Sequence, residues 1–557
     1  MRKLRSHWTR WRVLLALPLA LLATGCSTRQ APVRVAQYSV SNQPLPPAEQ
    51  IYHCGVSGSP RSLDPSLATD EPSFDVLVNL FQGLTTLGPH GSIRPGIAKS
   101  WTISDHGLRW VFHLHRHAGW SNGQPVTAAD FVWAWQREVN PATAAQYAES
   151  LDMIRNASAI VNGKLPPTAL GVHAEGPHTL VVDLVQPTPF LPADLVNNEF
   201  MPLYAPTIER WGYAWTNPPH LVSDGAFYLK TNIINGHMTL LKNPYFWDAA
   251  AVHLRTVIMY PIRNPAAALD RYLAGDIDYS SAPTAFPPSD ITMLRRELGP
   301  QVVVVPNFAT GYLGMLVHRK PFDNRDLRLA LSMALERNVL SNKLGRGLTV
   351  PAYSLMPPLH GYVQQVPDWA HWPRDQRLAE ARKLYAKAGY GPGHELHVRM
   401  LFEIEGTAQR HYMEALTWMW RHNLGAHVEL WSEQWKVMLQ DIQYKNAKLY
   451  WSAWIGNYLD PNTFMRQFQT GYAMNYGDFN DPAYEKLLTQ AQNMQGGPAR
   501  MAVFEHAERV LNTQEPFIPL YFYTAASLVK PYVRGWYPNL MDIHPAQYIE
   551  LMQHTEH

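Results

Sequence analysis

Residues 94–137 read RPGIAKSWTISDHGLRWVFHLHRHAGWSNGQPVTAADFVWAWQR and decide the fold of this part of the chain. Residues 108–117 alternate apolar and polar side chains, which is the pattern of a half-buried strand. The run WSNGQ that starts at Trp120 consists largely of turn-forming residues. Thr127 is placed to cap a following helix, and Asp130 stands three residues on, where it can reach back to the cap. The stretch therefore predicts a strand, a turn and a helix in this order.

Strands and helices continue to alternate along the rest of the chain. Helices are predicted to end at glycines, which tolerate the left-handed conformation that often follows a last helical turn. The predicted elements are strands at residues 180–185, 302–305 and 426–431 and helices at residues 323–344 and 433–443 and before Gly389 and Gly425. Strand–helix–strand order at this pitch predicts an α/β fold with a mainly parallel sheet in this region.

The N-terminus has the features of a secretory signal. Five basic residues and no acid precede an apolar run at residues 13–24, which is short for a permanent membrane span. The following Gly25 and Cys26 resemble a bacterial lipobox, which would make Cys26 the lipidated first residue of the mature protein. Plain signal-peptidase cleavage near residues 23–25 is the alternative. Residues 27–49 lack apolar periodicity and end in a proline cluster, so they are predicted to form a tether.

Composition limits the class of protein. The 557 residues, of which 46% are hydrophobic, supply enough core for two or three domains. Cys26 and Cys54 are the two cysteines, and lipidation of the first would leave no intramolecular disulfide. A formal net charge of +2 argues against binding to nucleic acid.

The motif pattern of residues 94–137 is similar to that of the extracellular solute-binding proteins of peptide ABC importers. The shared core is P-G-x-A-x-x-W, a strand, W-S-x-G-x-P-V-T-A-x-D-F, and W-x-R at the helix end. Further matching motifs follow in the same order: SLDPSLATDE, SDGAFYLK, KNPYFWDA, RYLAGDIDY, PFDNRDLRLALSMALERN, ARKLYAKAGY and LVKPYVRGWY. The resemblance runs from about residue 50 to the C-terminus and points to the oligopeptide-binding and murein-peptide-binding branch.

The resemblance implies a two-lobed, three-domain α/β fold of the periplasmic binding protein type, with mixed sheets and a hinge. Domain I would combine residues 50–72, 197–308 and 526–557, domain II would be residues 73–196, and domain III residues 309–525. Ligand would bind in the cleft between the lobes, which close by hinge motion. Permease subunits in the inner membrane would then recognise the closed form. No cofactor is implied, and a monomer is expected.

The segment AWIGNYLDP at residues 453–461 is the predicted ligand wall. In enteric relatives the matching segment reads W-x-A-D-Y-x-E-P, and its aspartate is held to pair with the α-ammonium of the peptide. Asn457 takes the aspartate position, so this chain lacks that charge. Tyr458 and Asp460 match the tyrosine and the second acid, and Trp454 and Ile455 would line side-chain pockets.

Other ligand positions of the family also differ in this chain. Counting without gaps between Trp435, which we assign to the same wall, and Tyr458, two arginines become Trp451 and Ile442. Trp451 and Trp454 stand on opposite faces of the predicted strand, so either could instead fill the core. The remaining carried-over positions are Gln409 with the adjacent Arg410, Ser59 and Trp133, in place of a histidine, an acid and a tyrosine. The predicted cleft is thus less charged and more aromatic than the enteric pattern.

Neither a metal site nor a catalytic site is predicted. His113, His115 and His117 would share one strand face and could bind a transition metal, but side chains at a strand end commonly face solvent, and no metal site is predicted. No nucleophile elbow, H-E-x-x-H motif, phosphate loop or paired C-x-x-C motif occurs in the sequence. We therefore expect a binding protein and no catalytic residues.

The sequence predicts a periplasmic, lipid-anchored component of an ABC importer that binds oligopeptides or modified, cell-wall-derived peptides. One alternative is a non-peptide ligand: haem, a metal chelate or an apolar metabolite. Another is a chaperone or adhesin role for the lipoprotein. The sequence leaves open whether the anchor sits in the inner or the outer membrane.

Overall fold

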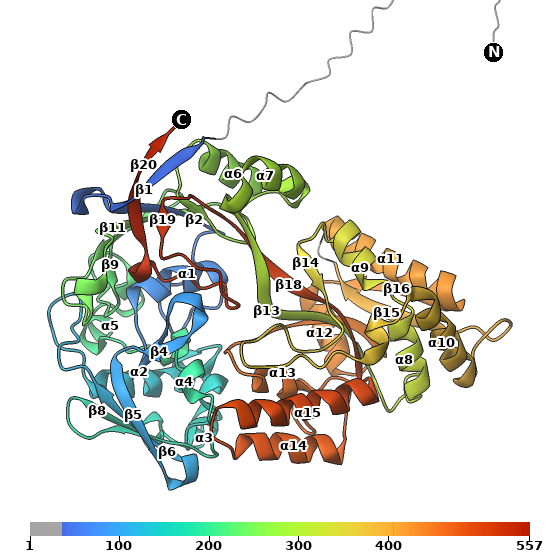
Figure 1. Cartoon of the computed structure of the whole chain (residues 1–557). Helices are drawn as coiled ribbons and strands as arrows, with labels where there is room; N and C mark the ends of the chain where they lie inside the picture. Colours follow the sequence, from blue (N-terminus) through green and yellow to red (C-terminus); the bar gives the residue numbers. More distant parts are fainter. Residues whose placement is uncertain (1–35, 405) are drawn as a thin grey trace, which may run out of the picture. The chain divides into compact units, whose positions relative to one another are not determined.

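Two long antiparallel strands, β13 (Val302–Met315) and β18 (Phe517–Val529), connect the halves of the fold in the computed structural model, which describes residues 36–404 and 406–557 (Figure 1). Residues 302–306 of β13 pair with β18, the register then shifts, and pairing resumes at Thr310. This break lies beside the domain boundaries predicted at residues 308/309 and 525/526. We call residues 309–525 the second lobe and the other described residues the first lobe.

The β13–β18 pair lies in the middle of a mixed sheet that has eleven strands within the described residues. Its order is β16 (His427–Glu433), β15 (His397–Glu403), β17 (Leu449–Ile455), β13, β18, β12 (Tyr279–Ser280), β2 (Ile51–Val56), β11 (Thr256–Pro261), β10 (Met238–Lys242) and β9 (Phe227–Asn232), with β14 (Thr349–Pro351) paired to β18. Strands β15, β16 and β17 are parallel, and so are β2, β11 and β12. The predicted parallel arrangement is thus confirmed for β15, β16 and β17. The antiparallel pairs made by β13, β18, β10 and β9 make the sheet mixed.

Smaller sheets and helices complete the two lobes. The sheets are β1 (Tyr38–Pro44) with β20 (Glu550–Glu556) and β19 (Val533–Arg534); β3 (Thr85–Leu87) with β4 (Ile93–Pro95); and β5 (Ala98–Ser104), β6 (Arg109–Leu114), β8 (Thr179–Asp183) and β7 (Val172–Ala174). Helices of the first lobe are α1 (Glu71–Leu80), α2 (Ala128–Glu138), α3 (Ala157–Val161), α4 (Leu191–Asp194), α5 (Ala205–Trp211), α6 (Pro265–Leu273) and α7 (Ile291–Glu297). Those of the second lobe are α8 (Arg325–Met333), α9 (Arg337–Val339), α10 (Arg374–Lys387), α11 (Gly406–Leu424), α12 (Trp435–Gln443), α13 (Asn462–Met465), α14 (Pro482–Gln492) and α15 (Pro498–Gln514).

The second lobe buries apolar side chains on both faces of its sheet. Leu313 and Met315 of β13 belong to the core that packs against α8, α10 and α11. Phe308 and Tyr312 of the same strand belong to the core beneath α13, α14 and α15. The period of two that separates these positions is that of a strand buried on both faces. Figure 1 shows α14 and α15 on one side of this lobe and α8, α10 and α11 on another.

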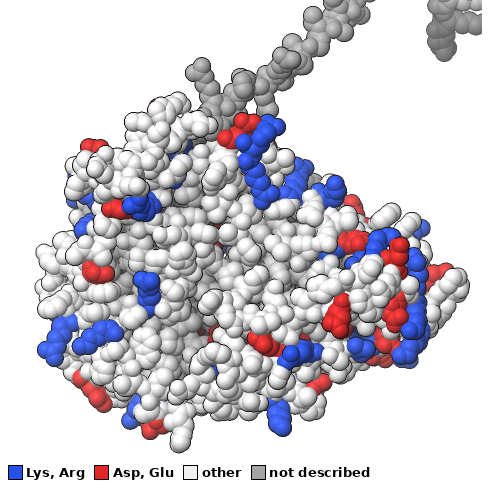
Figure 2. Space-filling model, in the orientation of Figure 1, with Lys and Arg blue, Asp and Glu red and all other residues white. Residues whose placement is uncertain are grey.

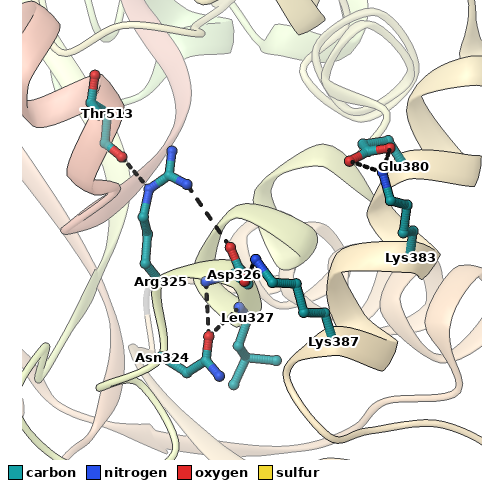
Figure 3. Close-up of polar contacts among 8 residues, drawn as sticks. All are labelled: Asn324, Arg325, Asp326, Leu327, Glu380, Lys383, Lys387 and Thr513. Atoms are coloured by element: carbon teal, nitrogen blue, oxygen red, sulfur yellow. Dashed lines mark hydrogen bonds and ion pairs between the residues drawn. The ribbon is translucent and has the colours of Figure 1, made fainter.

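The start of α8 shows how local sequence fixes the second lobe (Figure 3). Asn324 caps the helix, because its side-chain oxygen accepts hydrogen bonds from the N–H groups of Asp326 and Leu327 at 2.9 and 3.3 Å. Asp326 in turn pairs with Lys387 of α10 at 2.7 Å. The Arg325 side chain donates to the carbonyl of Thr513 in α15. One helical turn thus holds three helices in position.

Of two helix predictions, the structure confirms one and contradicts the other. The capping box is confirmed: Oδ2 of Asp130 accepts from the N–H and hydroxyl of Thr127 at 2.7 and 2.8 Å. The single helix predicted at residues 323–344 is wrong, because α8 ends at Met333 and a separate segment starts at Arg337. The guanidinium of Arg337 is fully buried and donates to the carbonyls of Ser332 and Pro519 at 2.9 and 2.7 Å. Tertiary hydrogen bonding therefore overrides the helical pattern here.

The N-terminal segment joins the folded body earlier than the sequence suggested. Strand β1 pairs with β20, and the hydroxyl of Tyr38 accepts a hydrogen bond from Lys530 at 2.9 Å. Burial lowers the pKa of Lys530 to about 8. The tether predicted for residues 27–49 therefore gives way to ordered structure from Tyr38 onward. The predicted signal peptide and Cys26 lie outside the described residues.

Two further observations concern the surface. In the described part of the chain, no helix is both long and apolar enough to span a membrane. Figure 2 shows few charged side chains over the middle of the visible face, whereas both signs gather at the margin where Figure 1 places α8 and α10. This distribution agrees with the low charged fraction of 17%.

Candidate functional site

The carboxyl ends of β15, β16 and β17 define the candidate site. These strands run parallel, so their last residues, Glu403, Glu433 and Ile455, lie at the same edge of the sheet. In open α/β sheets, ligands bind beyond the carboxyl ends of the strands. We call this edge of the second lobe the ligand edge.

The ligand edge exposes large apolar side chains. Ile404 is 58% exposed, Trp435 44% and Ile455 65%. Each follows or ends one of the three parallel strands, so together they form an apolar surface at this edge. Exposed apolar patches of this kind mark binding surfaces. Two of the predicted wall residues, Trp435 and Ile455, are therefore available to a ligand.

The backbone of β17 is also available at this edge. Strand β13 pairs with β17 along its whole length, from Leu449 to Ile455. On the opposite side, β15 pairs with β17 only at Tyr450 within the described residues. Residues 452–455 therefore carry a strand ladder on one side alone. Such an edge can accept hydrogen bonds from, and donate them to, an extended chain.

Asn457 lies just beyond β17 and is exposed. Its backbone N–H donates to the Thr463 hydroxyl at 3.4 Å, and its carbonyl accepts from the Asn197 side chain of the first lobe at 3.2 Å. Trp454 is half-buried on the face opposite Trp451, and its indole N–H donates to Thr463 at 3.2 Å. The predicted alternation of the two tryptophans is confirmed.

Trp451 and Ile442 are core residues in this structure. They are 4% and 2% exposed and pack in the core beneath α8, α10 and α11. Strand alternation turns Trp451 into the lobe, and Ile442 lies on the buried side of α12. Both were predicted to line the ligand site, but in this structure neither side chain has exposed surface that could contact a ligand.

Tyr458 and Asp460 are buried as well, at 5% exposure each. The Tyr458 ring stacks on Phe190 of the first lobe, with centroids 4.7 Å apart and an angle of 4° between the planes. Both oxygens of Asp460 accept from the buried guanidinium of Arg500, the Oδ1 contact being 3.0 Å long. Asp460 is thus already neutralised, so it does not replace the charge that Asn457 lacks.

The remaining predicted site residues are spread over both lobes. Gln409 and Arg410 stand in the first turn and a half of α11, which follows β15 at the ligand edge, and Arg410 pairs with Glu414 at 3.2 Å. Ser59 is exposed beyond the carboxyl end of β2, the matching edge of the parallel strands in the first lobe. Trp133 is half-buried in α2 and packs against the first-lobe core.

The histidine run does not form a cluster that could hold a metal. His113 lies in β6, whereas His115 lies beyond the strand and stacks on Trp247 at 4.1 Å. Burial, the larger effect, and nearby Lys99 lower the pKa of His115. No group of three potential metal-binding side chains occurs among residues 36–404 and 406–557 as far as they are described.

Sequence reasoning missed a group of acids next to the ligand edge. Glu138, Asp194 and Glu199 come from three separate elements of the first lobe. Glu138 stands 56 positions before Asp194, and no sequence motif connects the three acids. Only the fold brings Glu138 near the other two. Their neighbours Phe190 and Asn197, which contact residues 457 and 458, carried no signal either.

Comparison with known proteins identifies the family of this chain. A profile of the bacterial extracellular solute-binding proteins, family 5 (middle region), matches residues 92–476. The chain is 35% identical to the periplasmic murein peptide-binding protein MppA of Escherichia coli K12, over 86% of this chain and 89% of that protein. It is 32% identical to the periplasmic oligopeptide-binding protein OppA of the same strain, over 86% and 88%. It is also 32% identical to that strain's probable deoxycholate-binding periplasmic protein YgiS, over 89% and 92%.

Solved structures show the same fold. The unliganded open form of the murein tripeptide-binding protein MppA superposes with a TM-score of 0.84 at 32% identity, covering 93% of this chain and 99% of that one. The profile match spans more than half of the 557 residues. The chain therefore belongs to family 5 of the bacterial extracellular solute-binding proteins, the binding components of peptide ABC importers.

Proposed function

We propose that this protein captures an extended peptide at the ligand edge and delivers it to the permease of an ABC importer. The observation that carries the proposal is the open side of β17 at residues 452–455, flanked by exposed Trp435 and Ile455. Backbone hydrogen bonds to a strand edge are common to all peptides, so they give affinity without fixing the sequence. Aromatic walls add apolar contact with little demand on the identity of the side chain.

Asn457 limits the class of peptide that we expect to bind. A neutral amide accepts a hydrogen bond from an ammonium but does not neutralise its charge. Arg410 pairs with Glu414, and the two arginine positions of the family hold the buried Trp451 and Ile442. Peptides whose termini are both ionised should therefore bind weakly or through other groups. Terminally blocked or cell-wall-derived peptides become favoured ligands, in line with the similarity to MppA.

Titration calorimetry tests this proposal on the chain from residue 27 onward. A mixed tri- to pentapeptide library, the same library acetylated and amidated, and murein tripeptide are titrated in parallel. Binding of at least one peptide class supports the proposal, and tighter binding of blocked or murein peptides supports the narrower claim. Failure of all three peptide classes to bind contradicts the peptide function.

A second candidate is a binding protein for an apolar, non-peptide ligand. The exposed Ile404, Trp435 and Ile455 provide an apolar surface, and a relative of 32% identity is described as a probable deoxycholate-binding protein. Deoxycholate added to the same titrations distinguishes the two candidates. Saturable binding of deoxycholate, together with no binding of any of the peptides, would favour this second function.

The proposed location is the periplasm, with an anchor through lipidated Cys26. The basic start, the apolar run and the Gly25–Cys26 junction support this, together with the periplasmic relatives. A Cys26→Ser variant should appear in the soluble periplasmic fraction, whereas the wild type should sediment with membranes. The mass of the purified mature N-terminus distinguishes acylation from plain cleavage near residues 23–25.

A further inference from the structure

Three carboxyl groups of the first lobe influence one another electrostatically near the ligand edge, because Glu199 raises the pKa of both Glu138 and Asp194. Glu138 ends α2, Asp194 ends α4, and Glu199 stands in the short helical turn Asn198–Phe200. The indole N–H of Trp135 in α2 donates to the Phe200 carbonyl at 3.0 Å and holds α2 against this turn. We call Glu138, Asp194 and Glu199 the acid cluster.

The acid cluster has no counter-ion. Among the described residues, none of its members forms an ion pair. Glu138 is 1% exposed, and no hydrogen bond of standard geometry reaches either of its oxygens, although the nearby Ser66 hydroxyl favours its ionised form. The adjacent Arg137 is already paired with Asp64 at 2.6 Å. Buried carboxyl groups are normally hydrogen-bonded and paired with a cation, because leaving them alone is costly.

The burial of these acids raises their pKa values. Burial is the main cause that raises the pKa of Glu138 to about 8 and the pKa of Glu199 to about 7. Burial also raises the pKa of Asp194 well above its ordinary value, and the charge of Glu199 adds to this effect. Arg466 of the second lobe favours the ionised form of Asp194 but lies beyond ion-pair distance. Perturbed acids next to a candidate cleft are characteristic of functional sites.

The acid cluster is connected directly to the ligand edge. Asp194 is 4% exposed, and its Oδ1 accepts a hydrogen bond from the Asn197 amide at 3.1 Å. The same amide donates to the Asn457 carbonyl at 3.2 Å. The Asp194 carboxyl and the backbone of Asn457 are thus separated by a single amide group. A carboxyl group that a nearby cation would ionise therefore lies next to the position where the sequence lacks an acid.

We propose that the acid cluster receives a primary ammonium group of the ligand, with Asp194 as the contacting acid and Glu199 and Glu138 behind it. The proposal rests on the proposed peptide-binding function and names the group that replaces the missing charge of residue 457. Free amines then bind through the acid cluster, so the preference for blocked peptides is confined to a blocked carboxyl terminus. An ammonium has three donors and no acceptor, so the Asn457 side-chain oxygen and the Asp194 carboxylate are complementary to it. The positive charge would also compensate these acids more closely than Arg137 and Arg466 do, since neither arginine forms an ion pair with them.

The test measures the affinity of two probe libraries for the chain from residue 27 onward. The first library holds tri- to pentapeptides with free amines, and the second holds the same peptides with every amine acetylated. Asp194→Asn and Glu199→Gln remove charge with little change of shape. Glu149→Gln, an exposed acid of the same lobe in the turn Ala148–Leu151, is the matched control. Equal melting temperatures of variants and wild type establish that all are folded.

Asp194→Asn should weaken binding of the free-amine peptides about ten- to hundredfold, the range expected for a lost charge-assisted hydrogen bond, and leave the acetylated peptides unaffected. Glu199→Gln should have a smaller effect of the same kind, and Glu149→Gln should have none. Asn457→Asp in the Asp194→Asn background should restore affinity for the free amines. The inference is overturned if Asp194→Asn changes free-amine affinity by less than twofold, or weakens both libraries equally. Absence of peptide binding by the wild type would instead contradict the proposed function itself.

Discussion

Asp460 illustrates how a residue that matches a ligand position can serve stability. Its carboxylate is paired with Arg500, whose side chain is 2% exposed and also donates to the Ala491 carbonyl at 2.9 Å. Asp460→Asn would leave the guanidinium charged, buried and without its partner. Removing one member of such a pair typically costs about 3–5 kcal/mol in the free energy of unfolding.

Urea denaturation measures this cost. Glu380→Gln serves as the control, because it breaks the exposed Glu380–Lys383 pair, where a loss below about 1 kcal/mol is expected. Peptide affinity per folded molecule should stay unchanged in the Asp460→Asn variant. A stable Asp460→Asn variant with weakened peptide binding would instead assign Asp460 to the ligand.

Glu138 should make stability depend on pH. Its pKa is about 8 in the folded protein, raised by burial from an ordinary value of 4.5. The folded state therefore keeps a proton that the unfolded chain releases, so the stabilisation is full below pH 4.5 and is lost as pH rises toward 8. Arg137 and the Ser66 hydroxyl oppose the shift, and Glu199 and Asp64 add to it.

The Glu138→Gln variant isolates this effect, since glutamine is neutral at every pH. Any cost of the buried amide is constant, so the comparison of two pH values removes it. The variant should gain on the order of a few kcal/mol relative to wild type between pH 4.5 and 8.5. Calorimetric melting at both pH values checks this, and an unchanged difference between the two proteins would show that Glu138 is ionised when folded.

At the residue scale, sequence reasoning succeeds where the chemistry is local. Thr127 and Asp130 are three positions apart, and their capping box follows from that spacing alone. The neutral Asn457 is visible because a family motif surrounds it. The acid cluster is invisible in sequence, because burial and the absence of a cation are properties of the folded lobe. The same reason hides the Asp460–Arg500 pair, whose members stand 40 positions apart.

At the scale of elements, the end of β17 depends on a glycine. A Cβ atom added to Gly456 would lie 2.6 Å from Cε1 of Phe308 and 3.0 Å from Cε2 of Phe464. The Gly456 N–H donates to the Phe308 carbonyl at 2.8 Å, so the backbone has no freedom to retreat. Phe308 is fully buried near the break in β13. The contact thus links the ligand edge to the strand that joins the lobes.

Gly456→Ala should lower the free energy of unfolding by about 1–3 kcal/mol, the usual cost of overpacking. It should also weaken peptide binding, because the backbone that follows Ile455 must shift. Gly391→Ala is the matched control, since a Cβ atom there meets nothing within 4 Å. Thermal melting and peptide titration of the two variants decide the matter, and equal behaviour of both would refute the role of Gly456.

The apolar periodicity of the sequence predicts some helices and strands but not those that depend on distant parts of the chain. Strand β16 and the helices on either side of it, α11 and α12, were predictable, and α11 ends at Leu424 directly before Gly425. The break after α8 was not, since it depends on Arg337 reaching the carbonyl of Pro519 from a distant strand. Strand β1 was missed for the same reason: its partner β20 lies at the opposite end of the chain.

At the scale of the whole molecule, the two lobes are joined by β13 and β18 and also touch at the ligand edge. The contact includes the Phe190–Tyr458 stack at 4.7 Å and the hydrogen bond from Asn197 to the Asn457 carbonyl. Any contact that bridges the lobes favours arrangements in which both are close, and a ligand held by both lobes favours the same arrangements. Bridging residues should therefore contribute to affinity without touching the ligand.

Phe190→Ala tests this coupling. Loss of a stacked aromatic pair, typically about 0.5–1.5 kcal/mol, should raise the peptide Kd about two- to tenfold. It should also increase the radius of gyration, measured by small-angle scattering, at a peptide concentration equal to the wild-type Kd. Trp211→Ala is the control, because Trp211 stacks on His220 within the first lobe at 3.6 Å and bridges nothing. If both variants bind peptide like the wild type, the contact at residues 457 and 458 plays no part in closure, and affinity is determined by the ligand edge alone.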